Sequence, residues 1–229
     1  MSEQKERALA VVLVSGGMDS CVVAAMAAER YSLACLHANY GQRTERRELA
    51  CFNKIAEHYG AESKLIVDLS HLSRIGGSSL TDHDIPVTPS ETPGAIPLTY
   101  VPFRNANLLS AAVSWAEVIE ARKIFIGAVE QDSPGYPDCR PAFYRAFNEL
   151  VRVGTRPDTD VEVVAPLIGM KKHEIVRKGL DLGAPFHLTW SCYTREDVPC
   201  GSCDSCLIRA RAFDDAGASD PLINERPMV

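Results

Sequence analysis

The sequence lacks any apolar run near the roughly 20 residues that a membrane-spanning helix requires. Its first ten residues, MSEQKERALA, also lack the apolar stretch of a secretory signal. We therefore expect a cytoplasmic protein without membrane contact. With 229 residues, 46% of them hydrophobic, the chain can bury one large core and carry a small attachment.

The sequence also lacks an excess of basic residues, since its formal net charge is -6. Domains that bind a nucleic-acid backbone usually carry a basic face or stripe, so we expect no direct nucleic-acid binding. The densest basic cluster consists of Arg43, Arg46 and Arg47. Its helical spacing fits either a solvated helix face or a binding site for phosphate or carboxylate.

Apolar runs typical of buried strands alternate with segments of helical periodicity. The expected strands are residues 8–14, 31–40, 63–69 and 123–129, and the expected helices are residues 19–30, 43–60, 105–122 and 141–154. This alternation predicts an α/β fold with a doubly wound parallel sheet, whose ligand site lies at the carboxyl ends of the strands. We expect a main domain of residues 1–185 and a C-terminal module of residues 186–229. Residues 76–99 show no periodicity, which fits a lid or a disordered surface insertion.

The stretch SGGMDS, residues 15–20, stands between the first expected strand and the first expected helix. Gly16 and Gly17 lack a Cβ, so backbone N–H groups there can approach an anion closely, and the positive helix end adds attraction. Ser15 and Ser20 can supply further donors, and Asp19 can orient the loop or meet a magnesium ion carried by a nucleotide. The alternative is a tight turn with Asp19 or Ser20 near the helix N-cap.

Polar, glycine-bearing segments also follow two later strands. The first contains Tyr40, Gln42 and Arg43, and the second contains Asp132, Tyr136, Asp138 and Arg140. Such segments at strand carboxyl ends can face one crevice. Their side chains can bind the hydrogen-bonding edge of a heterocycle, and an arginine can hold a carboxylate with two hydrogen bonds. The alternative for the second segment is a turn built on its prolines and glycine.

Two expected helix starts carry charged residues. Arg104 and Asn105 stand at the first, where Asn105 fits an N-cap and Arg104 fits a phosphate ligand. Lys171 and Lys172 stand at the second, where the helix dipole disfavours cations. An anion near one of these lysines would explain their position.

Half of the eight cysteines fall within fifteen residues, CYTREDVPCGSCDSC. The four are Cys192, Cys200, Cys203 and Cys206. The Cys-x2-Cys spacing lets neighbouring thiolates reach one tetrahedral zinc ion at roughly 2.3 Å, and four thiolates leave no open position for water. We predict one structural zinc ion per chain. The alternatives are a redox pair, an iron–sulfur cluster, or His187 in place of Cys192. The remaining cysteines on expected strands or helices, Cys21, Cys35 and Cys51, are expected to be buried.

The SGGMDS stretch resembles the pyrophosphate loop of the N-type ATP pyrophosphatases, which cleave ATP at the α-phosphate. Together with YGQR, VPFRN, GYPDCR, SCY and CGSCDSC, it makes residues 9–213 similar to the 7-cyano-7-deazaguanine synthase family. The resemblance implies an adenine nucleotide alpha hydrolase-like fold, zinc, ATP with magnesium, and a homodimer. Met18 stands where that family usually has glutamine and Phe103 where it commonly has glycine, so the nucleotide contacts there are in question.

The resemblance implies a reaction of 7-carboxy-7-deazaguanine, ammonia and ATP that yields 7-cyano-7-deazaguanine for queuosine biosynthesis. Adenylation of the carboxylate makes AMP the leaving group, so ammonia can attack to form an amide. A second adenylation on the amide oxygen would permit dehydration to the nitrile. The alternatives are a tRNA-modifying sulfurtransferase or ligase with the same loop, and a nucleotide-binding regulator without catalysis.

Our hypothesis assigns three groups of residues. The ATP ligands are Leu13, Ser15, Gly16, Gly17, Met18, Asp19 and Ser20. The catalytic residues are Asp19, Arg104 and Lys172, which would stabilise developing charge. The ligands of the deazapurine and its carboxylate are Tyr40, Gln42, Arg43, Asp132, Tyr136, Asp138 and Arg140.

Overall fold

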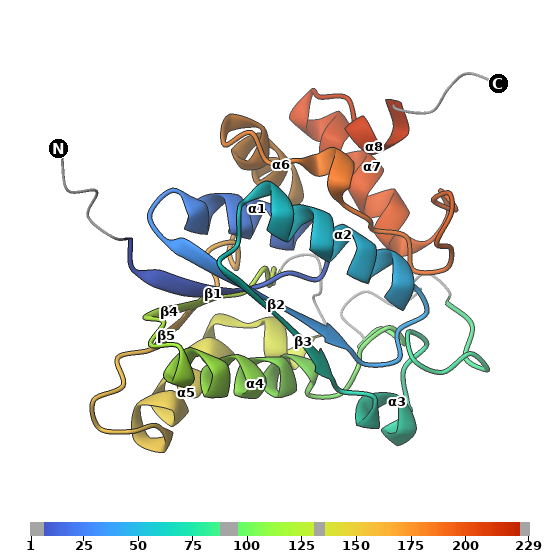
Figure 1. Ribbon diagram of the computed structural model, residues 1–229. Coiled ribbons are helices and arrows are strands. Elements are labelled where there is room, and N and C mark those ends of the chain that lie inside the picture. The colour runs from blue at the N-terminus through green and yellow to red at the C-terminus, as the bar shows by residue number, and fades with distance from the viewer. Residues whose placement is uncertain (1–6, 88–95, 131–135, 225–229) are drawn as a thin grey trace, which may run out of the picture.

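The structure, a computed structural model, describes residues 7–87, 96–130 and 136–224 (Figure 1). Five strands form one sheet in the order β3-β2-β1-β4-β5, and every neighbouring pair is parallel. The strands are β1 (Leu9–Leu13), β2 (Ser32–Asn39), β3 (Ser63–Asp68), β4 (Lys123–Phe125) and β5 (Glu162–Val164). The predicted parallel sheet is confirmed, although β5 was not predicted because three residues are too few to show a period.

Helices cover both faces of the sheet, which confirms the doubly wound arrangement (Figure 1). One face carries α1 (Met18–Ala28), α2 (Glu45–His58), α6 (Lys172–Asp181) and α7 (Asp204–Ala216), and the other carries α4 (Arg104–Val118) and α5 (Pro141–Gly154). The shorter elements are α3 (His71–Ile75), η1 (Pro137–Cys139), η2 (Phe186–Leu188) and α8 (Pro221–Asn224). Within the described ranges, no helix is long and apolar enough to cross a membrane.

The continuously apolar sequence of β1 follows from its central place in the sheet. Ala10 and Val12 pack into the cluster beneath α1, whereas Val11 and Leu13 pack into the cluster beneath α4. A strand covered by helices on both faces has no polar side, so its sequence does not alternate. The expectation that Cys21, Cys35 and Cys51 are buried is also confirmed, since each is at most 4% exposed.

The strand order reverses between β1 and β4, and this reversal places the functional loop. Chains leaving the two strands diverge to opposite faces, so a crevice opens at their carboxyl ends. Gly127, just after β4, lies against the start of α1, where an added Cβ would be 3.0 Å from backbone atoms of Asp19 and Ser20. A glycine at this position therefore lets the SGGMDS loop approach the end of β4 closely.

The C-terminal segment shares the main core. Phe186, Ala212 and Phe213 belong to the same buried cluster as the side chains of α1. Arg209 and Asp220, each with a side chain 5% exposed, form an ion pair within this segment. The division into residues 1–185 and 186–229 stays a prediction.

Candidate active site

A cavity of about 290 Å³ opens at the carboxyl edge of β1, β2 and β4. Its lining includes twelve residues predicted to bind ATP, catalyse the reaction or bind the deazapurine: Leu13, Ser15, Gly17, Met18, Asp19, Ser20, Tyr40, Gln42, Arg43, Arg104, Tyr136 and Lys172. Gly16, Asp138 and Arg140 do not line it, and Asp132 lies outside the described residues. The fold thus brings four separate predicted segments and one lysine to a single cavity.

The SGGMDS loop ends in a helix start without a side-chain cap. Gly17 is the N-cap of α1 and makes no side-chain capping hydrogen bond. Asp19 and Ser20 follow it in the first turn, so the tight turn with these residues near the N-cap is present, and it leaves room for an anion site at the same corner. The Gly17 N–H donates to Ser15 Oγ at 3.2 Å, and Ser20 Oγ donates to the Gly17 carbonyl at 2.9 Å. Gly16 has φ +87°, and a Cβ there would lie 2.6 Å from the Glu48 carbonyl oxygen. The loop is therefore held by its own hydroxyls, and the uncapped helix end faces the cavity, as anion binding requires.

Asp19 and Lys172 form an ion pair in the cavity wall. Lys172 Nζ lies 2.8 Å from Asp19 Oδ2, and the two side chains are 17% and 27% exposed, respectively. The other carboxylate oxygen, Asp19 Oδ1, is buried without a hydrogen-bond partner among the residues that the structure describes. The anion predicted near the two lysines is thus the Asp19 carboxylate, and it pairs with Lys172, while Lys171 is exposed as the N-cap of α6.

Arg104 contributes a cation to another part of the cavity wall. Its Nη1 donates to the Tyr40 hydroxyl at 3.1 Å, and its guanidinium lies 5.4 Å from the centre of the Tyr40 ring. Burial raises the pKa of Tyr40 to about 12, so this hydroxyl stays neutral. Arg104 Nε is buried without a partner in the described ranges. The guanidinium therefore retains donor capacity at the cavity.

The prediction that Asn105 caps the following helix is wrong. The helix α4 begins at Arg104, and its N-cap is Phe103 in the left-handed conformation, with φ 56°. The Asn105 side chain instead donates to the Asp138 carbonyl at 3.1 Å, and the Asn105 N–H donates to Asp138 Oδ2 at 3.0 Å. Asn105 thus joins α4 to the GYPDCR segment.

The GYPDCR segment reaches the cavity through Tyr136. Tyr136 is 9% exposed, and its hydroxyl hydrogen-bonds Thr99 Oγ1 at 2.7 Å. Asp138 is buried behind the wall, where it accepts the hydrogen bonds of Asn105. Arg140 is exposed as the N-cap of α5. We expected this whole segment to face the crevice, and Tyr136 does so, whereas Asp138 and Arg140 do not. The reason is that the 3-10 turn η1 directs successive side chains to different sides.

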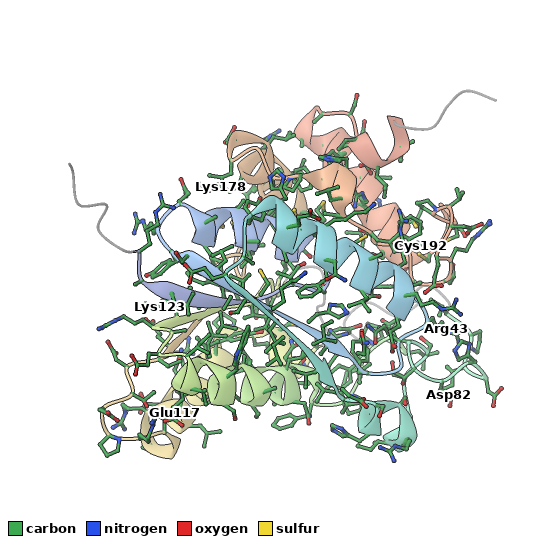
Figure 2. The ribbon with its side chains drawn as sticks, viewed as in Figure 1. Arg43, Asp82, Glu117, Lys123, Lys178 and Cys192 are labelled. Carbon is green, nitrogen blue, oxygen red and sulfur yellow. The ribbon has the colours of Figure 1, made fainter. Side chains whose placement is uncertain are left out.

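Arg43 ties a proline-rich loop to the cavity. Its Nε donates to the Ser79 carbonyl at 2.7 Å, and its Nη2 donates to the Asp82 and Ile85 carbonyls at 2.8 Å each. Figure 2 shows Arg43 beside Asp82 at one edge of the molecule. Ser78 and Ser79 are fully buried. This part of the loop is a packed wall, so the alternative of a disordered surface insertion is wrong for residues 78–85.

The predictions from sequence missed Glu48. Its carboxylate lines the cavity, accepting a hydrogen bond from Thr44 Oγ1 at 2.7 Å and another from Gln42 Nε2 at 3.2 Å. Burial raises the pKa of Glu48 to about 7, against the opposing effect of these hydrogen bonds. Glu48 lies in the first turn of α2, where an acidic residue is ordinarily explained by the helix dipole, so the sequence carried no separate signal for it.

The four clustered cysteines meet at one point. Their Sγ atoms all lie within 4.8 Å of one another, and each thiol is free of disulfide bonds. Cys192, Cys200, Cys203 and Cys206 could hold a metal ion without His187. Against the effect of burial, hydrogen bonds from Thr194, Ser202 and Cys203 lower the pKa of Cys200 to about 5. A thiolate at this position suits metal binding.

The cysteine cluster adjoins the cavity. Trp190, Cys192 and Tyr193 line the cavity, and the Trp190 N–H donates to the Gly16 carbonyl at 2.9 Å. Arg47 lies 4.5 Å over the Trp190 ring, and the backbone N–H groups of Arg46 and Arg47 donate to Glu196. Arg47 therefore contacts the C-terminal segment with both its guanidinium and its backbone. The Arg46 side chain is exposed, so the interpretation as a solvated helix face holds for Arg46 but not for Arg47.

The comparisons with known proteins agree with this geometry. A sequence model of the family described as "Queuosine biosynthesis protein QueC" matches residues 9–217. This chain belongs to the QueC family. A 7-cyano-7-deazaguanine synthase from Chlorobaculum tepidum is 60% identical over 215 residues, covering 93% of this chain and 95% of the relative. A 7-cyano-7-deazaguanine synthase from Chlorobaculum parvum is 58% identical, with the same coverage.

The family membership confirms the resemblance drawn from the motifs. Among solved structures, NMN synthetase from Francisella tularensis is similar with a TM-score of 0.49 and 13% identity, covering 98% of this chain and 80% of that one. Because the QueC match extends over residues 9–217, it includes the SGGMDS loop, the polar segments and the cysteine cluster together.

Proposed function

We propose that this protein converts 7-carboxy-7-deazaguanine and ammonia into 7-cyano-7-deazaguanine at the expense of ATP, in queuosine biosynthesis. The observation that carries the proposal is the single cavity that joins the SGGMDS loop to Tyr40, Arg104 and Tyr136. A cavity with an anion-binding helix end on one side and aromatic and cationic groups on the other suits an acyl adenylation, in which a phosphate and a planar carboxylate must meet. The curated relatives named 7-cyano-7-deazaguanine synthase support the same activity.

In this proposal the SGGMDS loop holds the ATP phosphates. The backbone N–H groups at the start of α1 and the Ser15 and Ser20 hydroxyls bind phosphate oxygens. The Asp19 Oδ1 atom, buried without a partner among the described residues, suits a magnesium ion that accompanies ATP, because Mg²⁺ prefers carboxylate and phosphate oxygens. Lys172 and Arg104 stabilise the negative charge that develops on the phosphate and on the carboxylate oxygen.

The deazapurine lies, in the same proposal, against the aromatic side of the cavity. Tyr40 and Tyr136, each 9% exposed, offer ring faces and hydroxyls to a planar heterocycle. Gln42 and Arg43 act by positioning, since the Gln42 amide accepts the Tyr40 N–H at 2.8 Å and Arg43 holds the loop that follows Ser78. Asp138 positions Asn105 and α4.

We propose zinc for the four-cysteine cluster. A tetrahedron with Zn–S distances of about 2.3 Å separates its sulfur atoms by roughly 3.8 Å. The Cys200 and Cys206 sulfur atoms are 3.9 Å apart, which fits one ion better than an iron–sulfur cluster, whose ligands are held farther apart. Four thiolates fill the coordination sphere, so the ion would be structural and would hold the Trp190–Tyr193 wall of the cavity.

We also propose that the protein acts as a homodimer, as the resemblance to the family implies. Light scattering of the purified protein distinguishes a dimer of about twice 25.0 kDa from a monomer.

The sulfurtransferase alternative needs a reactive sulfur carrier at the cavity. Cys139 lines the cavity, but burial raises its pKa to about 11, which suppresses the nucleophilic thiolate. The other cysteine there, Cys192, belongs to the metal cluster. These observations favour the synthase.

Mass spectrometry of the purified protein with 7-carboxy-7-deazaguanine, ammonium, magnesium and ATP tests the proposal. We expect nitrile, AMP and pyrophosphate. AMP release without amide or nitrile would move the search to another acceptor, and absence of ATP turnover would favour a nucleotide-binding regulator.

A further inference from the structure

Glu48 is a carboxylate in the cavity wall that the assignments above leave without a role. It stands in the first turn of α2. The backbone of this turn lies against the phosphate loop, since a Cβ on Gly16 would be only 2.6 Å from the Glu48 carbonyl oxygen. Its side chain reaches the cavity beside Gln42 and Thr44. Glu48 therefore lies between the loop proposed to hold ATP and the segment proposed to hold the deazapurine.

Among the residues that the structure describes, hydrogen bonds hold the Glu48 carboxylate and no ion pair neutralises it. Thr44 Oγ1 donates to Oε1 at 2.7 Å, and Gln42 Nε2 donates to Oε2 at 3.2 Å. Gln42 is itself held, because its Oε1 accepts the Tyr40 N–H. Each carboxylate oxygen has two lone-pair positions and receives one hydrogen bond from the described part of the chain, so each can accept another proton or N–H donor.

The charged and titratable groups that influence Glu48 come from several elements. Arg104 on α4 lowers its pKa, Glu45 on α2 raises it, and burial raises it most, to about 7. Tyr40 and Cys51 are further titratable neighbours, and their own raised pKa values keep both neutral near pH 7. A carboxylate with this pKa is ionised in part at neutral pH and is a stronger base than an exposed glutamate.

We propose that Glu48 accepts the proton released when ammonia attacks the adenylated carboxylate. The ammonia nitrogen forms a bond to the acyl carbon, the bond between that carbon and the AMP oxygen breaks, and AMP leaves with the electron pair. One N–H proton passes to the Glu48 carboxylate, so the products are the amide, AMP and a neutral Glu48 carboxyl, which returns its proton to water. This role rests on the proposed function and adds the base for its amination step.

The test separates adenylation from amination in the Glu48→Gln variant. Pyrophosphate exchange into ATP, with 7-carboxy-7-deazaguanine and without ammonium, reports adenylation alone. We expect E48Q to keep this exchange within about threefold, whereas amide formation from ammonium falls roughly 10²- to 10⁴-fold, as for loss of a general base. Hydroxylamine is a stronger nucleophile than ammonia, so it should still trap the acyl adenylate formed by E48Q as the hydroxamate. Glu45→Gln, on the same helix and outside the cavity lining, should leave both reactions within about twofold.

The pH profile gives a readout that a merely structural role would not change. At a constant concentration of free ammonia, wild-type amination should rise as the pH increases through about 7, because the carboxylate form is the base, and this rise should be absent in E48Q. Equal losses of exchange and amination in E48Q, or full amination by E48Q, would overturn the role of Glu48. Absence of carboxylate-dependent exchange in the wild type would instead overturn the proposed function itself, and with it this step.

Discussion

Lys172 Nζ contacts Asp19 Oδ2 at 2.8 Å, although the two residues are 153 positions apart in the sequence. The contact joins the first turns of α6 and α1, two helices that lie side by side on one face of the sheet (Figure 1). Both side chains line the cavity. A helix start is an unfavourable place for a lysine, and the Asp19 carboxylate compensates for it.

Replacement of either partner should impair the reaction with ATP. We expect Asp19→Asn and Lys172→Ala to lower AMP formation roughly 10²- to 10³-fold, the usual loss for one preorganised charged group at developing charge. Lys171→Ala removes the neighbouring exposed lysine and should stay within about twofold of wild type. Quantification of AMP by chromatography measures all three. Full turnover by the Asp19 variant would contradict our placement of the phosphates.

Removal of the metal should collapse one wall of the cavity. We expect about one zinc ion per chain by elemental analysis, and loss of both metal and activity in Cys203→Ser, because an incomplete thiolate set binds zinc weakly. Ser202→Ala, between two of the cysteines, should keep the metal, since it leaves all four thiols in place and the Ser202 backbone N–H still donates to Cys200 Sγ. A zinc-free protein with full activity would show that the cluster is dispensable.

The buried ion pair between Arg209 and Asp220 should dominate the stability of the C-terminal segment. Arg209 donates to both Asp220 oxygens at 2.7 and 2.8 Å and to Thr189 Oγ1 at 2.7 Å. Asp220→Ala leaves a buried guanidinium unpaired, so the free energy of unfolding should fall by about 3–5 kcal/mol. Asp214→Ala, on the exposed face of α7, should change it by less than about 0.5 kcal/mol. Urea denaturation monitored by circular dichroism measures both, and equal effects would refute the prediction.

The raised pKa of Glu48 has a consequence for stability as well as for catalysis. The folded state binds the proton more tightly than the unfolded state, whose glutamate pKa is near 4.3. The free energy of unfolding of the wild type should therefore fall, relative to that of E48Q, as the pH rises from about 4 through the folded-state pKa of about 7. The relative loss should total roughly 3–4 kcal/mol and level off above about pH 8. Urea denaturation of both proteins across this range measures the difference. If the free energy of unfolding of the wild type instead rose relative to that of E48Q, the pKa of Glu48 would not be raised in the folded state.

The left-handed residue Glu120 offers a stabilising change. It follows the C-terminus of α4 with φ 56°, where glycine is the usual residue. Glu120→Gly should raise the free energy of unfolding by about 1 kcal/mol, because it removes the Cβ conflict and a negative charge at the helix C-terminus. Glu120→Gln removes the charge alone and should gain less. Phe103→Gly should also gain less, since Phe103 packs edge-on against Phe143 at 6.4 Å. Thermal melts compare the three, and a lower melting temperature for Glu120→Gly would contradict this account.

The features that were predicted correctly depend on residues close in the sequence. The apolar run of β1 predicted burial on both faces, the position of SGGMDS predicted a strand-to-helix corner at the carboxyl edge of the sheet, and the cysteine spacing predicted thiols that meet at one point. For the same reason, the parallel sheet and the edge of the sheet that carries the cavity could be inferred before any coordinate was known.

Only the tertiary structure decided which side chains face one another. It paired Lys172 with Asp19, directed the donors of Arg43 to backbone carbonyls, and left Arg140 exposed outside the cavity. It also enclosed Glu48, whose sequence position suggests an ordinary acidic helix start. The physical reason is that a side chain's pKa, charge partner and direction depend on contacts among segments distant in the sequence, and those contacts exist only once the sheet and its helices have packed.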